Sequence, residues 1–229
     1  MTSRKNIYTS ISSLAISLVL LLAATTAQAQ GKMFRIEKDT IPLFRGFSVS
    51  FNLAGAATRI LSTSGEIEGA LRVNLHDQYF PIVELGYGLA DHDDEVTGLW
   101  YKTQAPFFRI GCDLNLLKKK HQKNRLYGGL RYAFTAYNID VQHRNFPDPV
   151  WQWTTGMNET GIACSQHWLE AVFGLDAYIW GPLHLGWDVR YKRRIAHKDP
   201  AIGQSWYVPG YGEYGDTRLT ANFNIIIDI

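Results

Sequence analysis

Charged residues of both signs occupy one set of alternate positions along several stretches of the chain. Arg109 and Asp113 lie four positions apart, and Asp188 and Arg190 lie two positions apart. Side chains two residues apart in a strand point to the same face, so these acids and bases are predicted to face one common space. The principal candidates for this charge network are Arg72, Glu84, Arg109, Asp113, Arg131, Glu170, Asp176, Asp188, Arg190 and Arg218, with Glu66, Glu68, Lys192 and Asp228 pointing the same way.

The chemistry open to such a set is ion conduction or charge neutralisation. A charged lining could conduct ions through a pore, whereas paired acids and bases would fill the interior with salt bridges. Buried charges persist only when they are paired, so we favour the filled interior. A hairpin turning near Gln122 would set Asp113 opposite Arg131. An earlier hairpin would put Glu84 diagonal to Arg72.

Aromatic residues gather in two of the longer stretches between alternating segments. Trp151 and Trp153 lie in one of them, and Trp206 and Tyr207 lie in the other. Such rings could bind a glycan or a partner protein, or they could settle as an aromatic belt at a membrane surface, where Trp and Tyr concentrate. Both interpretations stay open, and the four residues are the candidates for an interaction site.

Catalytic and metal-binding patterns are weak in this sequence. An enzyme of this kind needs a nucleophile or a base at its outer rim, and the candidates are Ser165 with His167 and His197 with Asp199. We interpret both pairs as bystanders. The acidic run at 91–95 offers oxygen ligands for Ca²⁺, but it lacks the spacing and the Gly of a calcium loop. We therefore assign no catalytic residue, no cofactor and no metal site.

The elements that must position these side chains show a period of two. Eight segments alternate apolar and polar residues, from Phe47–Gly55 to the C-terminus at Ile229. Their apolar faces carry no charged residue. Lipid demands this, because an Arg or Lys at the bilayer midplane costs about 2–4 kcal/mol. The chain is therefore predicted to be all-β, an eight-stranded antiparallel up-and-down barrel that crosses a membrane.

Short and long connections alternate between the eight segments. The short ones are expected at His76-Asp77-Gln78, Lys118–Asn124 and Gly181-Pro182, and the long ones run from Asp91 to Gln104, His143 to Gln166 and His197 to Asp216. Outer-membrane barrels have this rhythm, with short periplasmic turns and long outer loops.

A soluble barrel of the lipocalin type, with its apolar faces inside, would produce the same alternation. The polar face argues against it, because it contains a single Lys, Lys192, whereas a water-exposed exterior normally carries many. This face is also rich in Gly, which leaves room in a narrow space for large side chains such as Arg131 and Tyr127. We therefore interpret the polar face as the lumen.

The first residues have the pattern of an export signal. Arg4 and Lys5 precede an apolar run from Ile11 to Ala24. Ala27-Gln28-Ala29 then places small residues at the two positions that a signal peptidase reads. The expected divisions are a cleavable signal peptide at 1–29, an N-terminal periplasmic segment at 30–44 and the barrel at 45–229.

Overall composition limits the functional classes further. The formal net charge is +2, which gives no case for a nucleic-acid-binding surface. After the signal, no segment approaches the roughly 20 apolar residues of a spanning helix. Cys112 falls in an alternating segment and Cys164 in a long connection, so we expect two free thiols rather than a disulfide.

With this alternation and a chain that stops inside its last strand, the sequence resembles the small eight-stranded barrels of outer membranes. These include the OmpA transmembrane domain, OmpX and the PorT-like barrels of the Bacteroidetes group. The resemblance covers Arg45 to Ile229. It implies insertion in the lipid bilayer of a Gram-negative outer membrane, contact with lipopolysaccharide, and recognition of the C-terminal strand by the barrel assembly machinery.

The expected function is a non-enzymatic barrel with a salt-bridged lumen that presents outer loops for envelope structure or interaction. A small channel, or an accessory barrel for transport or secretion, is the alternative. An outer-membrane hydrolase is a third and weaker hypothesis. We expect a monomer.

Overall fold

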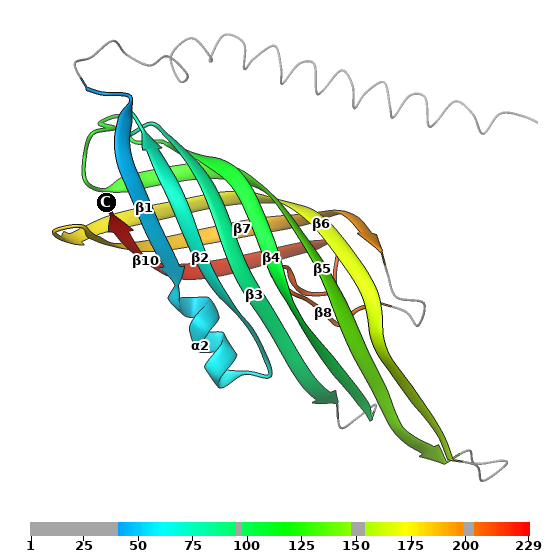
Figure 1. Ribbon diagram of the computed structural model, residues 1–229. Helices are drawn as coiled ribbons and strands as arrows, with labels where there is room; N and C mark the ends of the chain where they lie inside the picture. The colour runs from blue at the N-terminus through cyan, green and yellow to red at the C-terminus, as the bar shows by residue number, and fades with distance from the viewer. Residues whose placement is uncertain (1–40, 95–97, 148–153, 199–203) are drawn as a thin grey trace, which may run out of the picture. The chain divides into compact units, whose positions relative to one another are not determined.

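The computed structural model describes residues 41–94, 98–147, 154–198 and 204–229. Eight antiparallel strands form one closed barrel in the order β1-β10-β7-β6-β5-β4-β3-β2 (Figure 1). The strands are β1 (Phe44–Asn52), β2 (Ser64–Leu75), β3 (Tyr79–Asp94), β4 (Leu99–Asn115), β5 (Arg125–Pro147), β6 (Thr154–Trp180), β7 (Leu183–Lys198) and β10 (Thr217–Asp228). The predicted all-β, eight-stranded antiparallel barrel is confirmed.

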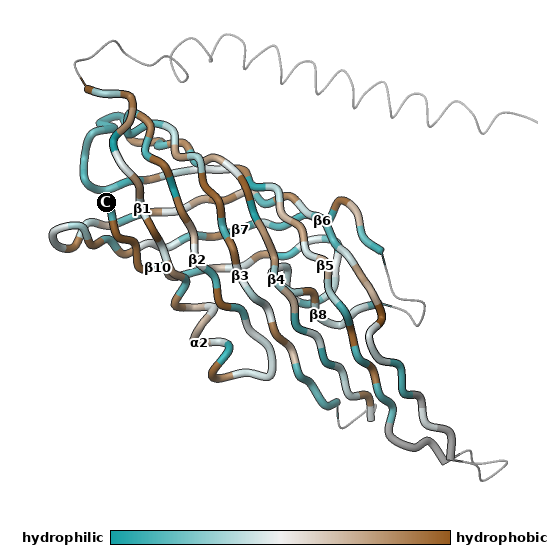
Figure 2. The backbone as a smooth tube through the Cα atoms, in the orientation of Figure 1, coloured by the Kyte–Doolittle hydropathy of each residue, from teal (hydrophilic) through white to brown (hydrophobic). Residues whose placement is uncertain are grey.

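Each strand alternates between the outside of the barrel and its lumen. In β5, Leu130, Tyr132 and Phe134 are exposed. Arg131 and Ala133 between them are only 2% and 0% exposed. Figure 2 shows hydrophobic and hydrophilic residues alternating along the strands. Because successive side chains of a strand point to opposite faces, the apolar set lies outside and the charged set inside.

The outer surface of the barrel is apolar on every strand. Its exposed large apolar residues include Phe47, Phe51, Leu71, Leu85, Ile110, Leu130, Leu169, Phe173, Trp187, Val189, Leu219 and Ile227. A soluble monomer rarely exposes a contiguous apolar surface of this extent. The outside of the barrel is therefore better suited to lipid than to water.

The barrel closes between its first and last strands. β1 pairs with β10, and Val49 lies opposite Ile227 in the register. The last residue completes this seam, because Ile229 N donates to Phe47 O at 2.7 Å and Phe47 N donates to Ile229 O at 3.1 Å. Closure removes the unpaired strand edges that an open sheet would present.

The first connection contains a helix that the sequence does not predict. The strand expected over Phe47–Gly55 ends at Asn52, and the chain continues as α2 (Leu53–Leu61). Asn52 caps this helix, because its Oδ1 accepts a hydrogen bond from Gly55 N at 3.1 Å. Ala and Leu dominate the next turn and favour the helix. Within the described residues, no helix is long and apolar enough to cross a membrane.

Two of the long connections are mostly strand. The prediction of loops at Asp91–Gln104 and His143–Gln166 is wrong for most of both ranges. β3 and β4 stay paired as far as Asp94 and Leu99, and β5 and β6 stay paired to the last residue of β5. Cys164 therefore lies in β6, where it is buried, rather than in a loop. Both cysteines are free, as predicted.

The predicted short connections are confirmed. β2 and β3 join through three residues, 76–78, of which His76 and Asp77 have φ of 59° and 55°. Gln78 N donates to Leu75 O across this turn at 3.1 Å. Two successive residues with positive φ give the turn twist that suits a hairpin. β6 and β7 join at Gly181, which also has positive φ. The short turns lie at the same end of the barrel as the C-terminus (Figure 1).

Gly129 lies against the lumen charges, whereas its neighbour Gly128 does not. A Cβ at Gly129 would lie 2.0 Å from Asp113 Oδ1, but a Cβ at Gly128 would have nothing nearer than Leu116 Cδ1 at 3.5 Å. We expect Gly129→Ala to lower the free energy of unfolding by about 1–3 kcal/mol through overpacking, and Gly128→Ala to change it little. Denaturant unfolding of both variants in the same lipid measures the difference. Equal stabilities would contradict a tightly packed lumen.

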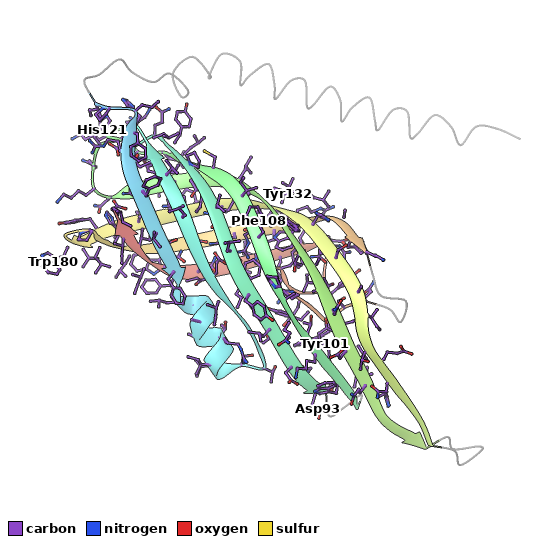
Figure 3. All side chains as sticks on the ribbon, in the orientation of Figure 1. Asp93, Tyr101, Phe108, His121, Tyr132 and Trp180 are labelled. Atoms are coloured by element: carbon purple, nitrogen blue, oxygen red, sulfur yellow. The ribbon has the colours of Figure 1, made fainter. Side chains whose placement is uncertain are left out.

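The Asp77 carboxylate ties the β2–β3 turn to its neighbours. Burial raises its pKa, but hydrogen bonds with His121 and Asn74, at 2.8 and 2.7 Å, and the charge of Arg45 hold the pKa below its usual range. His121 lies at the end of the barrel with the short turns (Figure 3). A lowered folded pKa adds stability that is present above the unfolded pKa, about 3.9, and is lost as the pH falls through the folded value.

The Asp77 carboxylate therefore supplies pH-dependent stability. We expect the wild type to be more stable than the Asp77→Asn variant at neutral pH, and the difference to shrink only below about pH 4. Denaturant unfolding of both proteins across this pH range measures it. A difference that stays constant down to about pH 2 would show that the carboxylate charge contributes nothing.

Candidate functional site

Arg109 of β4 lies inside the lumen and is fully buried. Its Nε donates to Glu170 at 2.9 Å, and its Nη1 donates to Glu68 and, at 3.3 Å, to Glu84. These carboxylates come from β6, β2 and β3, so one guanidinium links four strands. A buried charge is stable only when it is paired and hydrogen-bonded. The inward positions of the four strands supply those partners.

Two further arginines share the same acids. Arg131 of β5 donates to Glu84. Arg190 of β7 lies 3.0 Å from both Glu68 and Glu84, and its Nε lies 2.7 Å from Asp188. Glu84 therefore accepts hydrogen bonds from three arginines. The ion pairs form one connected network, because each of these arginines shares Glu84 with the others.

Nearer the short turns, two more arginines pair with the remaining acids. Arg72 of β2 lies 2.7 Å from Asp176 and 3.1 Å from Asp113. Arg125 of β5 donates to Asp228 of β10, its close partner. The ion pairs therefore continue along the lumen from the level of Arg109 to the turn end.

The pairings predicted for the network are partly wrong in register. Asp113 is paired with Gly129 in the sheet and reaches Arg131 diagonally, at 3.2 Å. Glu84 is diagonal to Arg72 in the register, but Arg72 crosses the lumen to β6 instead. The interior of an eight-stranded barrel is narrow enough for an arginine to reach across. Strand neighbours therefore do not decide the partners.

Two charged residues differ from the sequence prediction. Arg218, predicted in the network, lies at the outer rim and pairs with Glu213 at 2.6 Å, outside the buried cluster. The first residues of β10, which include Arg218, lie farther toward the outer end of the barrel than the buried acids. Arg125 was missing from the prediction but belongs to the network. It shares the inward face of Tyr127 and Arg131, so extending the alternation of β5 by one step identifies it.

A segment of the last connection folds into the outer mouth of the barrel. Residues 204–216, which we call the inserted segment, contain a short hairpin of β8 (Tyr207–Val208) and β9 (Gly212–Glu213) (Figure 1). Val208 and Tyr211 are fully buried. The prediction of an outward loop is therefore wrong for these residues.

Two lumen cations hold the inserted segment. Arg109 Nη2 donates to Gly210 O at 2.7 Å. Lys192 Nζ donates to the same oxygen at 2.8 Å and to Tyr211 O at 3.3 Å. Gly210 has φ of +80°, and a Cβ there would lie 2.4 Å from Phe107 Cγ, so this approach requires glycine. The outer closure thus depends on the same arginine that links the lumen acids.

The aromatic residues predicted as an outward interaction site are placed differently. Tyr207 is buried, and its carbonyl accepts a hydrogen bond from Tyr101 OH at 2.7 Å. Its expected outward role is therefore wrong, because it packs in the mouth of the barrel. Trp206 stacks on His92, with ring centroids 4.4 Å apart. The two other candidates, Trp151 and Trp153, lie outside the described residues.

The weak catalytic and metal patterns do not assemble into a site in the described part of the chain. No group of three or more His, Cys, Asp and Glu residues there could hold a metal ion. Asp91 accepts a hydrogen bond from Trp100 Nε1 at 2.9 Å and lies 3.6 Å from Lys102 Nζ. His167 is engaged with an aromatic neighbour, because its Nδ1 lies 2.7 Å from the hydroxyl of Tyr132.

Loss of the Arg109 side chain would leave Glu68, Glu84 and Glu170 short of a buried partner and would remove one of the two cations that hold the inserted segment. We expect Arg109→Leu to lower the free energy of unfolding by about 3–5 kcal/mol. Arg218→Leu removes a partly exposed pair and should cost at most about 1 kcal/mol. Urea unfolding in lipid vesicles compares the two variants. A loss for Arg109→Leu as small as that for Arg218→Leu would mean that the network compensates for its central cation.

Solved structures with a similar fold include proteins of bacterial outer membranes. A major outer membrane protein from Thermus thermophilus is 13% identical, with 80% of this chain and 98% of that chain covered and a TM-score of 0.45. Ail, the attachment invasion locus protein of Yersinia pestis, in complex with the heparin analogue sucrose octasulfate, is 9% identical, with 80% and 93% covered and a TM-score of 0.36. Acinetobacter baumannii CarO2 is 10% identical, with 83% and 100% covered and a TM-score of 0.38.

Sequence comparison gives a family but no curated relative. No curated protein matches the chain. The model of one family, by contrast, matches residues 8–228, which is nearly the whole sequence. The barrel with its salt-bridged lumen and inserted segment therefore belongs to the family described as a domain of unknown function (DUF6048).

Proposed function

We propose that this chain is a non-enzymatic outer-membrane barrel that acts as a closed scaffold. It presents the outer ends of its hairpins and the mouth of the barrel for envelope structure or interaction. The observation that carries this proposal is the filled lumen. Ion pairs occupy it from the level of Arg109 to the turn end, and the inserted segment covers its outer end.

The outward surface supports a membrane location. Leu85, Leu130 and Leu219 are 63%, 69% and 69% exposed on strands whose inward residues are charged. Exposure of this kind is unfavourable in water and favourable in lipid. The export signal expected at 1–29, which lies outside the described residues, and the terminal strand that the barrel assembly machinery would recognise support delivery to the outer membrane. Lipopolysaccharide would then surround the outer half.

The packing of the lumen supports a closed barrel over the alternative of a small channel or a transport or secretion accessory. Arg109, Glu84 and Glu170 are 0%, 1% and 0% exposed, so water does not reach them. An interior of eight strands has room for such side chains and little else. The pairing of β1 with β10 leaves no free edge in the barrel, which supports a monomer in the bilayer.

Conductance in planar bilayers tests the closed scaffold. The proteins to compare are the wild type and a variant in which a Gly-Ser linker replaces residues 206–214. We expect neither to conduct ions, because the ion pairs between Arg109 and its acids still fill the lumen when the inserted segment is gone. A shift in gel mobility between heated and unheated samples in detergent verifies that each protein is a folded barrel.

The outcomes separate the alternatives. Stepwise conductance by the wild type would replace the scaffold with a channel. Conductance by the linker variant alone would show that the inserted segment is the only barrier, contrary to two layers of closure. Recovery of the wild type in a soluble fraction, with no mobility shift, would contradict the membrane location itself.

A further inference from the structure

A half-open pocket of about 260 Å³ lies beside the inserted segment at the outer end of the barrel. Its walls come from α2, the first residues of β2, the outer part of β10 and the inserted segment. Its neutral polar lining includes Thr58, Ser62, Ser64, Tyr207, Tyr211 and Asn222. A concave site with converging polar groups is the usual form of a small-molecule site.

Four charged residues also line this pocket, and only two of them satisfy each other. Arg218 Nη2 donates to Glu213 Oε2 at 2.6 Å. The Glu66 carboxylate makes one long ion pair, 3.9 Å from Arg109, and no side-chain hydrogen bond to the part of the chain that the structure describes. Lys192, which is 2% exposed, uses two N–H donors on carbonyls of the inserted segment. An ammonium has three donors, so one remains.

We propose that this pocket binds a neutral polyhydroxylated ligand, a mono- or disaccharide unit, between Glu66 and Lys192. A hydroxyl group both donates and accepts, so neighbouring hydroxyls can donate to the Glu66 carboxylate and accept from the free Lys192 donor. The two acids and two bases of the lining cancel, so the pocket attracts neither cations nor anions strongly. Ser62 and Ser64 in the same lining are exposed and half-buried, and their hydroxyls can add hydrogen bonds to the sugar.

The pocket shares Lys192 with the contacts that hold the inserted segment. Lys192 both lines the pocket and holds the inserted segment, so the ligand would contact the group that maintains the outer closure. The pocket is at the end of the barrel opposite the short turns, where an outer-membrane barrel faces the exterior. The proposal therefore goes beyond the closed scaffold and gives its outer mouth a ligand.

The test uses the full-length folded barrel in lauryldimethylamine oxide, a detergent that contains no sugar. Maltose, lactose and N-acetylglucosamine are the probes, and glycine, phosphate and putrescine are the charged counter-probes, with affinity measured by calorimetry. We expect saturable binding of at least one sugar. Glu66→Gln should weaken it about tenfold, since a carboxylate acceptor becomes a neutral one. Glu159→Gln, the same change at an exposed position of β6 outside the pocket, should leave the affinity unchanged.

Three results would overturn the proposal. The first is no binding of any of the sugars at millimolar concentration. The second is tighter binding of glycine, phosphate or putrescine than of every sugar. The third is an affinity that does not change in Glu66→Gln, or that falls equally in Glu66→Gln and Glu159→Gln. The gel-mobility shift excludes misfolding as the cause. Failure of sugar binding leaves the closed scaffold intact, because that proposal depends on the lumen and on conductance.

Discussion

The interior of this barrel depends on the burial of the Arg109 guanidinium. Removing such a group from water costs several kcal/mol, which only close partners can offset. Glu68, Glu84 and Glu170 supply the opposite charge, and Gly210 O accepts from the remaining side of the guanidinium. The charge network and the outer closure are therefore one structure, because the same cation belongs to both.

The choice of arginine for this network follows from geometry. A guanidinium carries five N–H donors in a rigid plane, so it can serve several acids at once, which an ammonium cannot do in the same way. Lys192 is accordingly used differently, on two backbone carbonyls. Glycine supplies the space. A Cβ at Gly174 would lie 2.4 Å from Tyr127 Cζ, so the large inward residues face positions without side chains.

The barrel itself could be predicted from the sequence, because lipid outside and a charged lumen inside require apolar and polar residues to alternate along each strand. Leu130 and Arg131 illustrate this, since a slip of one residue would put the arginine in lipid. The helix α2 could not be predicted in this way, because the apolar spacing after Asn52 fits a strand and a helix equally well. The hairpin ends were missed for a related reason. They extend past the apolar surface, where alternation no longer separates lipid from lumen.

The candidate site was harder to predict, because its contacts join distant parts of the chain. Most lumen residues follow from strand parity, but their partners do not, since arginines reach across the barrel. The contact of Arg109 with Gly210 spans 101 positions, and no local pattern encodes it. Pro209 and Gly210 do signal a turn in the sequence, but a turn inside the mouth and a turn outside it have the same signature.

The inserted segment leads directly into β10, which begins at Thr217 and forms the seam with β1. The strand that closes the barrel, β10, is therefore directly continuous with the inserted segment that covers its outer mouth. Pairing of β10 with β1 therefore completes the ring with the residues that cover its outer mouth directly adjacent in the chain, in addition to the ion pairs that fill the lumen.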